Sequence, residues 1–229
     1  MRPFERLYDH VDESKVKKRN RIAWPQDRLF GFTDGVFAFA ITLLVLNLIN
    51  LPVRAGVHSL IPLLQANTAT FASFALTFFI IARFWMSHTR LFAIIKSFDS
   101  TIVRLNNTLL FFVTTFPFIA SVLGSHTGDE DAVILSAGCF AIIGILLYLI
   151  GRHAYEKKLF INENFNDNFL KIFSFFSLST PIVFIVSIVV ALVSPLCAEI
   201  IWAALLFLRI GFRYYYRNNH EDEIEIDEL

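Results

Sequence analysis

The sequence predicts an all-α membrane protein that crosses the bilayer six times. Hydrophobic residues make up 55% of the 229 residues and charged residues only 17%, against roughly a quarter in soluble domains. The charges cluster at the two ends of the chain and in a few short patches. A helix needs about 20 apolar residues to cross a bilayer. We read six such stretches, at Arg28–Ile49, Thr68–Trp85, Val103–Leu123, Ala132–Ile150, Leu170–Val193 and Cys197–Phe212.

Local signals support these stretches in order along the chain. The first follows Pro25, which suits a first helical position, and Asp27, whose charge favours the positive end of a helix. The second and third flank the basic segment around "SHTRLFAIIK", and the fourth is nearly free of charge. The third and fifth contain Pro117 and Pro181, which a spanning helix tolerates because neighbouring helices satisfy the freed carbonyls. The sixth ends in a run of arginines.

The distribution of lysine and arginine predicts the orientation of the chain. The basic segments are Lys15–Arg21, Arg90–Arg104, Arg152–Lys158 and Arg209–Arg217. The alternate connections carry only Arg54, the acidic "GSHTGDEDA" and "SPLCAE". Because basic loops favour the cytoplasm, six spans and two cytoplasmic termini are expected. A transmembrane domain over residues 25–213 then lies between a cytoplasmic flank (1–24) and an acidic cytoplasmic tail (214–229).

Composition and motifs argue against several other classes of protein. The formal net charge is zero, so no broad basic surface for nucleic acid is expected. The two cysteines, Cys139 and Cys197, provide neither a disulfide framework nor a zinc site. The sequence lacks HExxH, GxSxG and P-loop motifs, and also the "TVGYG" filter of many potassium channels. We therefore expect no enzyme and no cofactor. The polar N-terminus predicts no cleaved signal peptide.

Charged residues at the start of the first span need partners on other helices. Arg28 and Asp34 are six residues apart, or about 240° around a helix, so they cannot form an i,i+4 pair. An unpaired carboxylate at the membrane boundary is costly. The expected donors on the second and third spans are Trp85, His88, Arg90 and Asn106. Such a cluster has two possible roles. It either only stabilises the packing of the helices, or it holds the first helix in place because that helix lines a functional feature of the protein.

These residues carry a resemblance to a known family. "RLFGFTD" is similar to the RxxxFSD signature of the TMEM175 family of potassium channels. Arg28, Phe32 and Asp34 match that signature, and Thr33 replaces its serine while keeping the hydroxyl. "FWMSHTRLF" resembles the Trp/His motif of the family's second helix, and "NNTLLFFVTTFPF" resembles its third helix. The similarity extends over residues 28–123.

The resemblance implies a potassium-selective channel in which the first helix lines a central pore. Carried over by distance from Asp34, the pore-lining positions are Phe39, Thr42, Leu43 and Leu46. Their i, i+3, i+4, i+7 spacing also places them on one helical stripe. Potassium ions would pass close to the Thr42 hydroxyls. The family usually has Ile or Leu where this sequence has Phe39, which leaves open where the pore is narrowest.

The resemblance also implies an assembly and a location. One six-helix unit per chain implies a homotetramer in the plasma membrane of a prokaryote, with the lipid bilayer and monovalent cations as its partners. Two alternatives remain open at this point. One is a proton-coupled secondary transporter that titrates Asp34 and His88, and the other is a non-conducting membrane scaffold.

Overall fold

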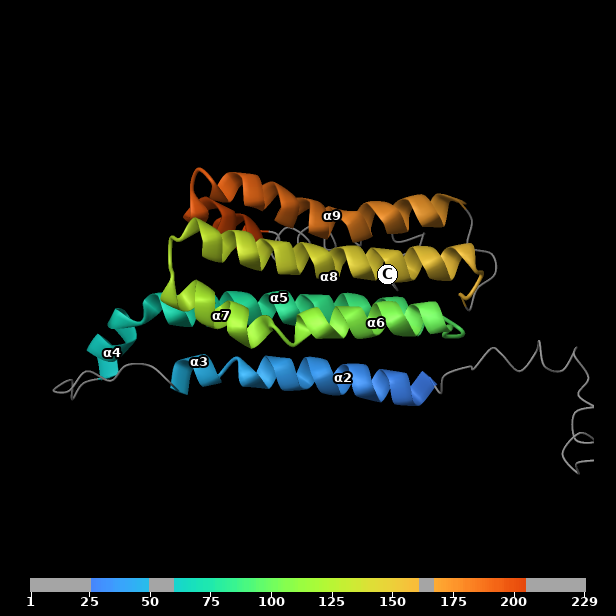
Figure 1. The fold of residues 1–229 in the computed structure, drawn as a ribbon, viewed down its shortest axis with the longest axis horizontal. Helices are drawn as coiled ribbons and strands as arrows, with labels where there is room; N and C mark the ends of the chain where they lie inside the picture. The colour runs from blue at the N-terminus through green and yellow to red at the C-terminus, as the bar shows by residue number, and fades with distance from the viewer. Residues whose placement is uncertain (1–25, 50–59, 161–166, 205–229) are drawn as a thin grey trace, which may run out of the picture.

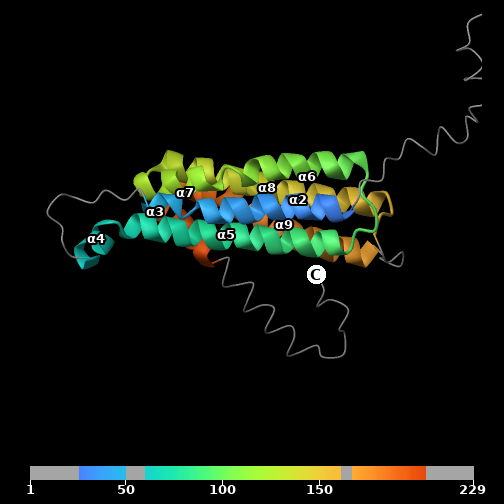
Figure 2. The same cartoon turned by 90° about the horizontal axis from the view of Figure 1, so that it is seen from below.

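The computed structural model describes residues 26–49, 60–160 and 167–204, and this part of the chain is almost entirely helical. The long helices lie side by side along one axis, in layers that run from α2 through α5–α7 and α8 to α9 (Figure 1). Figure 2 shows the same bundle after a 90° turn, with α2 between α5 and α6. The elements are α2 (Gln26–Leu43), α3 (Leu46–Ile49), α4 (Leu60–Ala66), α5 (Thr68–Ala93), α6 (Ser100–Val113), α7 (Phe116–Ser125), α8 (Glu130–Glu156) and α9 (Asp167–Ala191).

Four helical segments of the described chain are long and apolar enough to cross a membrane. They are Gln26–Ile49, Thr68–Ala93, Ser100–Ser125 and Glu130–Glu156. Two shorter apolar helices, Ser177–Ala191 and Pro195–Ala204, lie in the predicted fifth and sixth spans. The remainder of the sixth span and both predicted flanks, 1–24 and 214–229, lie outside the described residues.

The helix that contains the predicted second span is longer than that span. That span was expected to stop at Trp85, but α5 continues to Ala93. The apolar pattern weakens after Trp85, and hydropathy indicates where a chain lies in the membrane, not where its helix ends. The backbone hydrogen bonds continue through the polar residues, so Arg83 lies well inside α5 and not at its end.

The hydrophobic core is centred on α8. Its apolar window is 56% buried, against 28% in the segments that contain α2 and α5. Phe140 of α8 contacts Phe116, Phe184 and Trp202, with ring centroids 5.2, 5.1 and 5.5 Å away. The indole Nε1 of Trp202 donates a 2.7 Å hydrogen bond to Ser187 Oγ of α9, and both side chains are fully buried. These contacts hold α9 and the following helix against the rest of the bundle.

Two of the spanning segments are interrupted. The first breaks at Leu44–Val45, where Leu44 and Val45 donate to carbonyls three residues earlier and not four. The second breaks between α6 and α7, just before Pro117, which cannot donate a backbone hydrogen bond. The side-chain amide of Asn47 donates to the carbonyl of Pro117 at 3.1 Å. The two breaks are therefore tied to each other.

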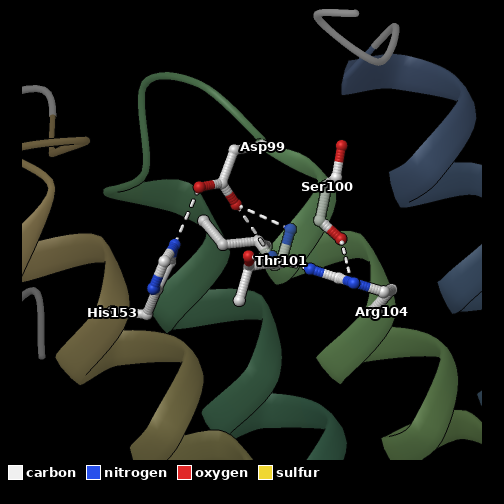
Figure 3. A network of polar contacts seen from close by, with 6 residues as sticks. Asp99, Ser100, Thr101, Arg104 and His153 are labelled. Carbon is white, nitrogen blue, oxygen red and sulfur yellow. Dashed lines mark hydrogen bonds and ion pairs between the residues drawn. The ribbon is translucent and has the colours of Figure 1, made fainter. Parts of the chain in front are cut away.

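At one end of the bundle, Asp99 connects α6 to α8 (Figure 3). Its carboxylate accepts hydrogen bonds from the backbone amides of Thr101 and Ile102 at the start of α6, and one from His153 Nε2 at 2.7 Å. Partial burial acts to raise the pKa of Asp99, but the bonds from His153 and the two amides outweigh it and lower the pKa overall. The carboxylate thus stays charged, and the cap stays formed, into the acidic range.

Close packing at Gly144 generates a prediction about stability. A Cβ atom at Gly144 would lie 2.9 Å from Cδ of Pro181, a ring atom that cannot rotate away. We expect Gly144→Ala to lower the free energy of unfolding by about 1–3 kcal/mol because it overpacks the α8–α9 contact. Reversible unfolding in mixed detergent micelles measures this loss.

Gly138→Ala, on the same helix, is the matched control. A Cβ atom there meets nothing within 4 Å, and alanine favours helix over glycine by roughly 1 kcal/mol. This variant should be neutral or slightly stabilised. Equal destabilisation of both variants would contradict the packing that the structure gives to Gly144.

Candidate functional site

Three buried polar side chains form a chain of hydrogen bonds between α2, α6 and α5. The amide nitrogen of Asn106 donates to Thr33 Oγ1 at 2.9 Å, and the amide oxygen of Asn106 lies 2.8 Å from His88 Nε2. All three residues are at most 1% exposed. The His88 ring stacks on Phe92 with centroids 3.8 Å apart. We call Thr33, Asn106 and His88 the polar triad; it joins three helices at one level.

Asp34 lies outside the polar triad, although it is adjacent to Thr33 in sequence. Successive residues point about 100° apart around a helix, so Asp34 is on the exposed side of α2. Its carboxylate accepts a 2.9 Å hydrogen bond from Trp85 Nε1. Of the expected donors, Trp85 is therefore the partner of Asp34, whereas His88 and Asn106 bond to each other.

The other two residues of the signature are both exposed. Arg28 is on the surface at the start of α2. Phe32 is 57% exposed. Within the described residues, the structure does not bring either side chain into the polar triad.

The predicted pore-lining residues lie mainly on the exposed face of α2 and α3. Phe39 is 66% exposed, Leu46 is 45% exposed and Thr42 is also exposed, whereas Leu43 is half-buried. The hydroxyl of Thr42 donates to the carbonyl of Phe39 at 2.9 Å. Because its hydrogen is engaged, the Thr42 oxygen can present its lone pairs outward as an acceptor. The stripe that carries these residues is thus apolar apart from the Thr42 hydroxyl.

Three residues that the sequence analysis did not single out have structural roles here. Asp99 could have been recognised, because an aspartate directly before a helical apolar run is a typical N-cap. Asn47 could not, because its bond to Pro117 joins residues 70 positions apart. Arg83 could have been recognised, because it is a charged residue inside the predicted second span. Among the described residues, no group of three His, Cys, Asp or Glu side chains could hold a metal ion.

The polar triad yields a prediction that separates its hydrogen bonds from its shape. Thr33→Val keeps the volume of the side chain but leaves the buried amide of Asn106 without its acceptor. We expect the free energy of unfolding to fall by about 1–3 kcal/mol. Thr33→Ser keeps the hydroxyl and should lose less. Unfolding in mixed micelles compares the two variants, and equal losses would mean that the methyl group matters more than the hydrogen bond.

Comparisons with known proteins show what this chain is similar to. Residues 28–117 match the family model described as "Endosomal/lysosomal potassium channel TMEM175". A protein of Chamaesiphon minutus named as a potassium channel is 33% identical over 132 residues, which are 56% of this chain and 64% of that protein. A zebrafish (Danio rerio) protein named as an endosomal/lysosomal proton channel, TMEM175, is 22% identical over 66% of this chain and 29% of its own length. This chain thus spans less than two thirds of either relative.

A solved structure extends the match over most of the bundle. The crystal structure of a TMEM175 homologue from Chamaesiphon minutus, described as a lysosomal potassium-selective channel homologue, superposes with a TM-score of 0.70 and 25% identity. The superposition covers 82% of this chain and 97% of that one. Together, the family model, the bacterial relative and the solved structure show that residues 28–117 resemble the TMEM175 family and that the bundle is similar in fold to a TMEM175 homologue.

Proposed function

We propose that this chain is one subunit of a homotetrameric, potassium-selective channel in which α2 lines the central pore. One observation carries the proposal. On a single copy of the chain, Phe39, Thr42 and Leu46 form an exposed stripe, and the opposite face of α2 is buried through Thr33 and Phe37. The relatives named as potassium channels support the choice of ion.

Conduction through such a pore is passive and follows the electrochemical gradient. A narrow section lined by Phe39, Leu43 and Leu46 sheds water, which raises the barrier to any ion until the section widens. Potassium holds its hydration shell less tightly than sodium does, so it loses less free energy in entering the apolar section. The four Thr42 oxygens of a tetramer would form a ring of acceptors within it.

The proposed topology has six spans with both termini in the cytoplasm of a prokaryotic cell. The distribution of lysine and arginine supports this orientation. The end of the bundle that carries Asp99, His153 and Lys157 would then be cytoplasmic, and the end that carries Asp129 would face outward.

A proton-coupled transporter that titrates Asp34 and His88 is a weaker alternative. His88 is 1% exposed and pairs with Asn106, whereas Asp34 is exposed and pairs with Trp85. The two groups therefore have separate partners. The zebrafish relative is named as a proton channel, so a test of function needs to measure proton flux as well as potassium flux.

Polar substitution on the exposed stripe tests the pore. Phe39→Asn and Leu43→Asn should each raise basal potassium leak and lower selectivity over sodium, because a hydrated constriction no longer forces the ion to dehydrate. Phe39→Ile, which restores the aliphatic side chain usual in the family, should conduct more readily than the wild type. Potassium, sodium and proton fluxes into reconstituted vesicles measure these effects.

Leu44→Asn and Val36→Asn are the controls for the stripe. Leu44 is fully buried and Val36 is half-buried. Both substitutions should destabilise packing without raising leak. If Phe39→Asn and Leu43→Asn assemble normally and leave all fluxes at the wild-type level, α2 does not line the pathway. Saturable flux coupled to protons would favour the transporter.

Accessible cysteines test the proposed orientation. In a variant that lacks Cys139 and Cys197, a cysteine at Asp129 should react with a membrane-impermeant reagent added outside intact cells. A cysteine at Lys157 should react only after the membrane is opened. Both positions are exposed in the structure, so burial would not explain a lack of reaction. Labelling of Lys157→Cys from outside would exclude the proposed orientation, in which this loop and both termini are cytoplasmic.

A further inference from the structure

A small cavity, lined by both apolar and polar side chains, lies between α5, α8 and α9. These three helices belong to successive layers of the bundle (Figure 1). Its volume is about 80 Å³, and it is not fully enclosed. The lining residues are Arg83, Phe84, Ser87, Gly144, Leu147, Ser177 and Thr180. One arginine and three hydroxyl groups thus face a space that could hold a few water molecules or a small ion.

The cavity lies near the middle of the bundle's length. Gly144 is about 20 Å from either end of α8 at 1.5 Å per residue. The hydrocarbon core of a bilayer extends only about 15 Å on each side of its midplane. Lipid headgroups therefore do not reach this depth. An ionisable residue at such a depth that faces a cavity is a candidate for function by default.

The chemistry of the lining favours a negative ligand. A guanidinium is permanently charged and carries five N–H donors and no acceptor. The hydroxyls of Ser87, Ser177 and Thr180 can each donate one more hydrogen bond. None of the lining residues that the structure describes is a carboxylate.

A backbone carbonyl without its usual helix donor also belongs to this region. Pro181 has no N–H, so the carbonyl of Ser177 lacks the helix donor four residues on. Because a guanidinium has several N–H groups in a fixed fork, Arg83 can donate to such a carbonyl and to a ligand at the same time.

The charge of Arg83 repels a cation, so a cation is disfavoured in this cavity. A multiply charged anion would lose more hydration free energy at this depth than a monovalent one.

We propose that this cavity, lined by Arg83, Ser87, Ser177 and Thr180, binds a small monovalent inorganic anion such as chloride. The site is separate from the exposed stripe of α2 and does not depend on the proposed conduction of potassium. The bound anion lies beside Arg83 and links α5, α8 and α9 through hydrogen bonds.

Thermal unfolding of the full chain in detergent tests the site. Potassium chloride is exchanged for potassium gluconate at constant ionic strength, because gluconate is too large for the cavity. The unfolding temperature should rise with chloride and saturate, and bromide should act in the same way. Thr180→Val removes one hydroxyl at constant shape and should raise the half-saturating chloride concentration about tenfold. Arg83→Gln should abolish the chloride effect.

Thr108→Val is the matched control, because Thr108 is an exposed threonine of α6 whose hydroxyl donates to Arg104. It should keep the wild-type chloride response.

Crystals of the full chain grown in bromide give a direct readout, with an anomalous peak expected within hydrogen-bonding distance of Arg83. If Arg83→Gln does not fold, the chloride response of Thr180→Val and the bromide peak test the proposal in its place. Identical responses to chloride and gluconate, an unchanged response of Thr180→Val, or no bromide peak in the cavity would each overturn the proposal.

Discussion

The hydrogen bonds between Thr33, Asn106 and His88 fix the rotation of α2, and the exposed surface of the bundle depends on that rotation. A buried polar group in a membrane must find a partner within the protein, and Asn106 serves both neighbours because its amide donates and accepts. With Thr33 turned inward, Phe37 and Ala40 follow it into the core. Phe39 and Thr42 are then left on the outside. The apolar stripe therefore follows from a polar contact two turns away.

Away from these hydrogen bonds, close packing around α8 holds the bundle together. Lipid tails are as apolar as leucine, so the hydrophobic effect gives little reason for one helix to leave lipid for another. Shape then decides which helices associate. The contact of Gly144 with Pro181 and the aromatic cluster of Phe140 and Trp202 supply that shape. Gly144 also lines the cavity, so the same residue of α8 both packs against Pro181 and borders that cavity.

The sequence predicted the helical class and the positions of the long apolar helices, because hydropathy reports which residues face lipid. It did not predict the end of α5, since hydropathy does not report where helical hydrogen bonds stop. The contact of Asp34 with Trp85 shows a second limit. Each expected donor lies on a helix next to α2, but which of them pairs with Asp34 depends on the rotation of α2. The buried contact of Thr33, the preceding residue, fixes that rotation. The break at Leu44–Val45 has no proline or glycine to mark it, and no local signal would have revealed it.

The bond between Asn47 and Pro117 has a mechanical consequence. It joins two helices just past the points where each is interrupted, and an interrupted helix bends more easily than a continuous one. The long inner portions, α2 and α6, are clamped together by Thr33 and Asn106. The short outer portions, α3 and α7, are clamped together by Asn47. The helices are thus joined in pairs on each side of the two breaks, so a tilt of α3 would also displace the start of α7.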